Sequence, residues 1–230
     1  MKRTLAALPL IAVAGFTHAA TIDVTVSNLT QAITFTPLLV TAHSSDSYLF
    51  RLGESASPEL QAMAEGGDIS GLNTLADSIG AYSVANPAEG LLMANGSTMI
   101  SDWDTGENTQ LTIVAMLLPT NDGFVGLDSW SIPETPGTYT LYLNGYDAGT
   151  EANDEIINGG GASGVPGIPA NPSGMGGENA TGVIATEVND RVHIHPGNVG
   201  DTDPDGGISD VNSRVHRWLN PVAKVVVVVK

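Results

Sequence analysis

The chain has 230 residues, 42% of them hydrophobic, which is enough for one sizeable domain with its own core. Its formal net charge of −17 disfavours direct binding to nucleic acid or to anionic lipid. It contains no cysteine, so packing or a bound metal has to stabilise it without disulfides. The 27 glycines and 13 prolines favour a turn-rich β fold over a helical bundle.

The first 20 residues have the pattern of a secretory signal peptide. Lys2 and Arg3 give a positive start, residues 5–16 are apolar, and small residues follow at a plausible cleavage site. The apolar run is too short for a good transmembrane span. We therefore expect residues 21–230 to form the mature protein, secreted to the periplasm or the extracellular space.

Alternating apolar and polar side chains predict strands along much of the mature chain. Residues 21–29 and 138–143 alternate, and residues 110–118 form the most convincing core strand. The last segment, 222–230, is so apolar that we expect partners on both of its edges. Shorter extended segments are predicted at 32–35, 38–42, 48–52 and 188–195.

Two short helices interrupt this pattern. Ser57 can cap a helix that begins with Pro58, and Gly66 and Gly67 end it. A second short helix is predicted over residues 69–79.

With about eight strands and one or two short helices, the sequence predicts an all-β fold, an antiparallel two-sheet β-sandwich. Residues 158–182 are rich in glycine and proline, which predicts a long surface loop inside the domain.

Two acidic, glycine-bearing loops are predicted at neighbouring strand ends. Calcium takes six to eight oxygen ligands, and Asp122, Asp147 and Glu151 can supply three side chains to one ion. Gly149 allows a sharp turn between the last two. The alternative is a set of solvated loop acids. The first loop carries Asn121, Asp122 and Asp128, and the second carries Asp147, Glu151, Asp154 and Glu155.

A second acidic run offers a weaker metal candidate. Asp201, Asp203 and Asp205 alternate before Gly206, like the opening of an EF-hand loop. Asn212 occupies the position where such a loop needs a closing glutamate. The alternative is a polar turn.

Histidines provide the alternative of an enzyme. His193 and His195 share one face of a predicted strand and could bind zinc together with His216 or His43, as in a metal-dependent hydrolase. However, the chain has no HExxH spacing, no GxSxG motif and no cysteine nucleophile. We therefore do not expect an enzyme.

Four segments, NDGFVGLDSW, YDAGTEAN, RVHIHPGNVG and HRWLNPVAKV, resemble the spondin N-terminal domain family in its bacterial branch, over roughly residues 22–229. The resemblance implies a C2-like β-sandwich and a calcium site at Asp122, Asp147 and Glu151. The last is glutamate where animal members carry aspartate. Animal members also carry cysteines near this region, so their receptor partners are not implied here.

Animal members of the family are extracellular-matrix and adhesion proteins. The resemblance therefore implies a secreted calcium-binding module for adhesion or for interaction with an extracellular or cell-surface protein or glycan. Two alternatives stay open, a purely structural exported protein and a metal-dependent hydrolase.

Overall fold

The computed structural model describes residues 20–185 and 189–230, so the predicted signal peptide lies almost entirely outside the described residues. Within these ranges, no helix has the length and apolarity needed to cross a membrane. The elements in chain order are β1 (Thr21–Asn28), β2 (Thr34–Phe35), β3 (Leu39–His43), α1 (Pro58–Gly66), α2 (Ser70–Ser78), β4 (Tyr82–Ala85), β5 (Ser97–Asp104), β6 (Gln110–Leu118), β7 (Gly123–Ser131), β8 (Gly137–Asp147), β9 (His193–Ile194) and β10 (Ala223–Val229).

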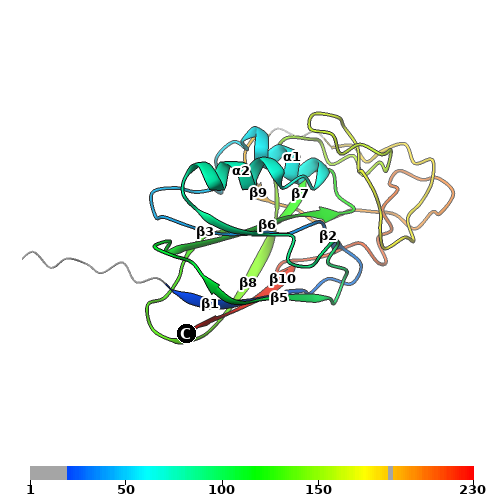
Figure 1. The fold of residues 1–230 in the computed structure, drawn as a ribbon. Coiled ribbons are helices and arrows are strands. Elements are labelled where there is room, and N and C mark those ends of the chain that lie inside the picture. The colour runs from blue at the N-terminus through cyan, green and yellow to red at the C-terminus, as the bar shows by residue number, and fades with distance from the viewer. Residues whose placement is uncertain (1–19, 186–188) are drawn as a thin grey trace, which may run out of the picture.

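All strand pairs between these elements are antiparallel, and the strand order is β4-β3-β6-β7-β8-β10-β1-β5. Figure 1 shows β3, β6 and β7 above β1, β5 and β10, with the two helices covering the upper strands. The prediction of an antiparallel all-β fold with two short helices is confirmed. The structure has ten strands where about eight were expected, because β4, β5 and β7 lie where no strand was predicted, whereas one predicted segment, 48–52, forms none.

The strands form one continuous, barrel-like path and not the two separate sheets that we predicted. The reason is the length of β8, which has 11 residues. Its first half, up to Leu143, pairs with β10, and its second half, from Asn144 to Asp147, pairs with β7. One strand therefore passes from the lower group of strands to the upper group.

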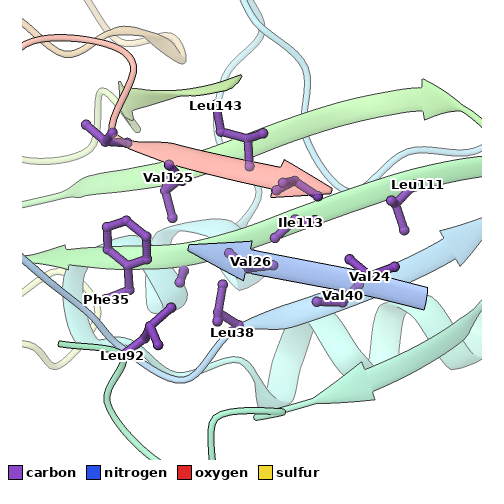
Figure 2. Packing of buried hydrophobic residues seen from close by; sticks show 14 of the residues in the cluster. Val24, Val26, Phe35, Leu38, Val40, Leu92, Leu111, Ile113, Val125 and Leu143 are labelled. Atoms are coloured by element: carbon purple, nitrogen blue, oxygen red, sulfur yellow. The ribbon is translucent and has the colours of Figure 1, made fainter. Parts of the chain in front are cut away.

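The main core lies between these two groups of strands. Alternate valines of β1 and β10, among them Val24, Val26, Val225 and Val227, point into it and are buried. Figure 2 shows Val24 and Val26 facing apolar side chains of the upper strands, such as Ile113. The apolar β10 segment has β1 on one edge and β8 on the other, which confirms the expectation that it is paired on both sides.

A second apolar cluster lies between the helices and the upper strands. Leu60 and Met63 of α1 pack with Val114 and Met116 of β6. Strand β6 is therefore buried on both faces, and this explains its almost uninterrupted apolar sequence. As predicted, the Ser57 side chain caps α1 and Pro58 is its first residue.

Three local predictions were wrong. Residues 48–52 form no strand; Phe50 instead fills the space under the helices, with its ring 5.2 Å from that of Phe124. Asp128 lies within strand β7 and not in a loop. Of the predicted 188–195 strand, Val188 lies outside the described part, and the remainder contains only the short β9.

The glycine- and proline-rich segment 158–182 has no regular element in the structure, as expected for a loop. It lies at the end of the molecule next to α1 (Figure 1). It is not entirely at the surface, because Ile168 is fully buried and forms a bridge with Ile157.

The inward and outward faces of β10 should respond differently to the same substitution. Val225→Ala should lower the free energy of unfolding by about 2 kcal/mol, because it removes buried carbon atoms and leaves a cavity. Val226→Ala, on the partly exposed face of the same strand, is the matched control and should cost much less. Urea unfolding measures both; equal losses would contradict this assignment of faces.

Candidate metal centre

Strand pairing brings two of the predicted ligands together. Gly123 at the start of β7 pairs with Asp147 at the end of β8, and Asp122 precedes Gly123 directly. The Ala148 amide also donates to the Asp122 carbonyl at 3.2 Å. Both aspartates have 0% of their surface exposed. Two carboxylates from separate turns are therefore buried at the same end of the sheet.

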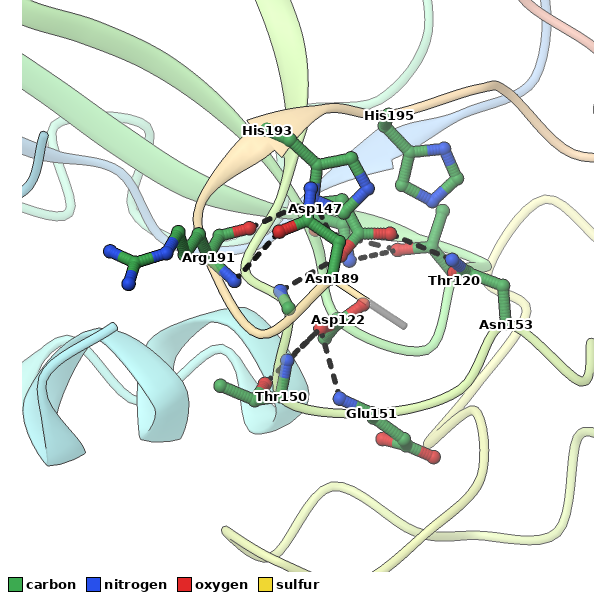
Figure 3. A network of polar contacts seen from close by, with 12 residues as sticks. Thr120, Asp122, Asp147, Thr150, Glu151, Asn153, Asn189, Arg191, His193 and His195 are labelled. Carbon is green, nitrogen blue, oxygen red and sulfur yellow. Dashed lines mark hydrogen bonds and ion pairs between the residues drawn. The ribbon is translucent and has the colours of Figure 1, made fainter. Parts of the chain in front are cut away.

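The Asp122 carboxylate is held by the loop that follows β8 (Figure 3). Its Oδ2 accepts hydrogen bonds from the Thr150 amide at 2.8 Å, the Thr150 hydroxyl at 3.1 Å and the Glu151 amide at 3.1 Å. Its Oδ1 is buried and has no hydrogen-bond partner among the described residues. One oxygen is therefore fixed by the loop, while the other can accept a further ligand.

The Asp147 carboxylate is oriented by its own turn. Its Oδ1 accepts from the Gly149 amide at 2.8 Å, and its Oδ2 accepts from the Asn153 side chain at 2.7 Å. His193 Nδ1 lies 3.7 Å from Oδ1. Gly149 has a φ of +71°, and a Cβ there would lie 2.6 Å from the Arg191 amide nitrogen. Glycine is therefore required for this turn to form against the neighbouring segment.

Burial and mutual repulsion dominate the electrostatics of the pair. Burial, followed by the charge of Asp147, raises the pKa of Asp122 to about 7, although the amide hydrogen bonds from Thr150 and Glu151 oppose the shift. A group of this kind gains most from a nearby positive charge, because a cation removes both the repulsion and the desolvation cost.

The third predicted ligand is placed differently. Figure 3 shows the Glu151 carboxylate pointing away from Asp122, although its backbone amide donates to Asp122. Its Oε1 accepts from the Asn121 side chain at 3.0 Å and from the Gly167 amide, and burial raises its pKa. Its Oε2 is buried without a hydrogen-bond partner among the described residues. Its role as a ligand stays a prediction.

The side chains of the predicted set therefore fit a cation in part. The unpartnered Asp122 Oδ1 next to the Asp147 carboxylate supplies hard oxygen donors of the kind that calcium prefers. Across residues 20–185 and 189–230, however, no three His, Asp or Glu side chains are already arranged to hold a metal ion. A complete site needs Glu151, backbone carbonyls or water in addition.

The histidine alternative meets a chemical obstacle. His195 is buried, and its Nδ1 accepts a hydrogen bond from the Gly197 amide at 2.9 Å. In the neutral imidazole the proton then resides on Nε2, so that nitrogen offers a metal no lone pair. Burial lowers the pKa of His195 to about 4, which keeps it neutral. His195 is therefore a buried neutral imidazole and not a zinc ligand in this arrangement.

The other histidines form hydrogen bonds with separate partners. His193 Nδ1 donates to the Arg191 carbonyl at 2.8 Å. His43 bonds to Thr112 and His216 to Ser173, each at a separate place in the fold. The predicted grouping of His193 and His195 with His43 or His216 does not form among the described residues.

The second acidic run forms a polar turn. Asp201 Oδ1 accepts from the Asp203 amide at 2.9 Å, and its Oδ2 accepts from the amides of Ile208 and Ser209 at 2.8 and 3.0 Å. These hydrogen bonds lower the pKa of Asp201. Asp203 in turn accepts from the Asp205 amide at 3.1 Å. Backbone amides therefore satisfy Asp201 within this turn, and a second calcium site at the run stays a prediction.

Glu155 has a structural role that the sequence did not reveal. It is 4% exposed and accepts from the Val199 and Gly200 amides and from the Ser209 hydroxyl, at 2.5, 2.8 and 2.6 Å. These partners lie more than 40 residues away in the chain, so no local pattern points to them. Glu155 thus fixes the segment from Val199 to Ser209 against the end of the sheet.

The family model described as Spondin_N matches residues 27–155, which is more than half of the 230-residue chain. The chain belongs to the Spondin_N family. Spondin_N domains are non-enzymatic, extracellular-type modules, and the match confirms the resemblance found in the sequence. No curated protein gives a significant match to the chain.

Loss of the Glu155 carboxylate should destabilise this Spondin_N module strongly. Glu155→Ala removes the buried carboxylate that accepts three hydrogen bonds from a distant segment, so the free energy of unfolding should fall by about 3 kcal/mol or more. Glu107→Ala, at an exposed loop position, is the control and should change stability by less than about 0.5 kcal/mol. Similar values for both variants in urea unfolding would contradict the role assigned to Glu155.

The stability of the metal-free module should depend on pH in a way that reflects the raised pKa of Asp122. Its folded pKa of about 7 lies above the unfolded value near 3.8, so its contribution to stability falls as pH rises through this interval. His195, with a folded pKa of about 4, acts in the opposite direction up to pH 6.5. Because both the wild type and Asp122→Asn contain His195, its contribution cancels when their free energies of unfolding are subtracted at each pH.

In chelator, Asp122→Asn should therefore gain about 2–4 kcal/mol relative to the wild type between pH 4 and pH 7, with no further gain above pH 7. Urea unfolding at several pH values measures this difference. A difference that does not vary with pH would show that Asp122 keeps an ordinary pKa.

Proposed function

We propose that this Spondin_N chain is a secreted calcium-binding module that acts in adhesion or in another interaction at the cell surface or in the extracellular matrix. The observation that carries the proposal is the buried, unpartnered Oδ1 of Asp122 beside the buried Asp147 carboxylate. A divalent cation bound there stabilises both charges at once. Glu151, the third member of the predicted set, joins the ion by rotation of its side chain.

The donor set favours calcium over zinc or copper. Its side chains offer carboxylate oxygens, which suit hard cations, and His195 offers no lone pair at Nε2. Outside cells calcium is abundant enough to fill sites of modest affinity. Bound calcium would supply positive charge to the two carboxylates, and the Thr150 and Glu151 amides would keep Asp122 in place to receive it.

The position of the site suggests how calcium would serve an interaction. In the C2-like arrangement implied by the family, loops at one end of the strand layers hold the ion and present their outer faces to a partner. Here the loop at residues 148–155 occupies that place. We propose an extracellular or cell-surface protein or glycan as the partner.

One observation favours a second candidate function, in which calcium only stabilises an exported protein. Asp122 and Asp147 are both 0% exposed, so an ion held between them would be enclosed and would not contact a partner. Capture of matrix proteins and glycans with and without chelator distinguishes the candidates. Calcium-dependent capture supports the interaction role, whereas calcium-dependent stability without capture supports the structural role.

Calcium binding itself is tested by titration calorimetry on the mature protein. Asp122→Asn and Asp147→Asn should each weaken calcium binding at least about tenfold, because each removes a charged oxygen ligand. Asp203→Asn, an exposed acid of the polar turn, is the matched control and should bind calcium like the wild type. Equal affinity in the wild type and Asp147→Asn would refute the site.

A further inference from the structure

The segment 158–169 is held against α1 and the proposed calcium loop by two glutamates. The Gly164 amide donates to Glu65, and the Gly167 amide donates to Glu151. Glu65 is 1% exposed, at the end of α1. Both contacts use a carboxylate from one element and a backbone amide of the segment, so the segment depends on where these two carboxylates point.

Close packing accompanies these two anchors. A Cβ on Gly66 would lie 1.9 Å from the Gly161 carbonyl oxygen, so the segment passes directly over the end of α1. Ile168 is fully buried, and its amide donates to the Ile156 carbonyl at 2.7 Å. The segment is thus a docked part of the fold despite its glycine and proline content.

Glu151 connects this segment to the buried aspartates. Its backbone amide donates to Asp122 at 3.1 Å, while its side chain accepts from Asn121 and Gly167. A small pocket of about 220 Å³ adjoins it, lined by Glu65, Glu151 and Asp154 among others. The negative charges of Glu65 and Asp154 both disfavour the ionised Glu151 in its present position.

A nearby cation would favour a different orientation of the Glu151 side chain. Glu151 leaves two like charges when it turns toward a calcium ion at Asp122 and Asp147, and it gains an opposite charge. It cannot keep its present hydrogen bonds to Asn121 and Gly167 in that orientation, since its carboxylate now points away from Asp122 (Figure 3).

We propose that calcium binding draws the Glu151 carboxylate from the Gly167 amide to the ion and thereby loosens the part of the segment around Gly167, while Glu65 and the buried Ile168 continue to hold the rest to the domain. The inference rests on the calcium site proposed above. Glu151 acts as the link between the ion and the segment, and the docking of the part around Gly167 depends on calcium.

Hydrogen–deuterium exchange on the full mature protein tests the link, with calorimetry on the same samples to establish calcium occupancy. In peptides that cover Gly167, its amide should exchange about tenfold faster at saturating calcium, as expected for the loss of one hydrogen bond to a charged group. Peptides from the strand β10 serve as the internal control and should not change.

Two variants distinguish the role of Glu151 as hydrogen-bond acceptor for the segment from its role as calcium ligand. Glu151→Ala removes the anchor, so the Gly167 amide should exchange quickly with or without calcium. Glu151→Gln keeps an acceptor oxygen for Asn121 and Gly167 but loses the charge, so the Gly167 amide should stay protected at all calcium concentrations. Slow hydrogen–deuterium exchange of the Gly167 amide in metal-free Glu151→Ala would show that Glu151 does not anchor the segment.

The failure of this inference is distinguishable from the failure of the calcium proposal. Calorimetric binding with unchanged or slower exchange of the Gly167 amide would overturn the link and leave the calcium site standing. Absence of calcium binding in the wild type would overturn both.

Discussion

Two like charges buried side by side are the constraint on which the functional end of this Spondin_N chain depends. Asp122 and Asp147 are fully buried, and the pairing of Gly123 with Asp147 holds their backbones next to each other. Folding can accept such a pair only through hydrogen bonds, protonation or a counter-ion. The structure uses the first, through the Thr150, Glu151, Gly149 and Asn153 donors, and the raised pKa of Asp122 shows that these donors do not offset the full cost.

The fold provides a rigid base for this pair. Strand β8 passes from the lower to the upper group of strands and ends at Asp147, so the core on both sides fixes the position of that carboxylate. The loop after β8 then turns at Gly149 and returns two amides to Asp122. Glu155, further along the same loop, holds a distant segment in place. One short stretch of chain therefore organises most of this end of the molecule.

Much of the fold could be predicted from the sequence, because its signals are local. Alternation in β1 and β10, the continuous apolar run of β6 and the Ser57–Pro58 helix start all appear as predicted. The proximity of Asp122 and Asp147 could be predicted as well, since both follow or precede neighbouring antiparallel strands. The path of β8 through both groups of strands could not, because strand bending leaves no mark in the residue pattern.

The details of the site depended on contacts between distant residues. The direction of the Glu151 side chain is set by Asn121 and by Gly167, and that of Glu155 by residues near 200. Phe50 lies in a loop although its sequence resembles a strand, because an aromatic pocket around Phe124 takes it up. Such partners are separated by tens of residues, and neither propensity nor periodicity identifies them.

The most direct test of the account is the anomalous scattering of calcium in a crystal of the mature protein grown with calcium. The account predicts a peak about 2.3–2.6 Å from Asp122 Oδ1 and from an Asp147 oxygen. A crystal with no peak between these two carboxylates, or with a peak only at the turn around Asp203, would contradict it.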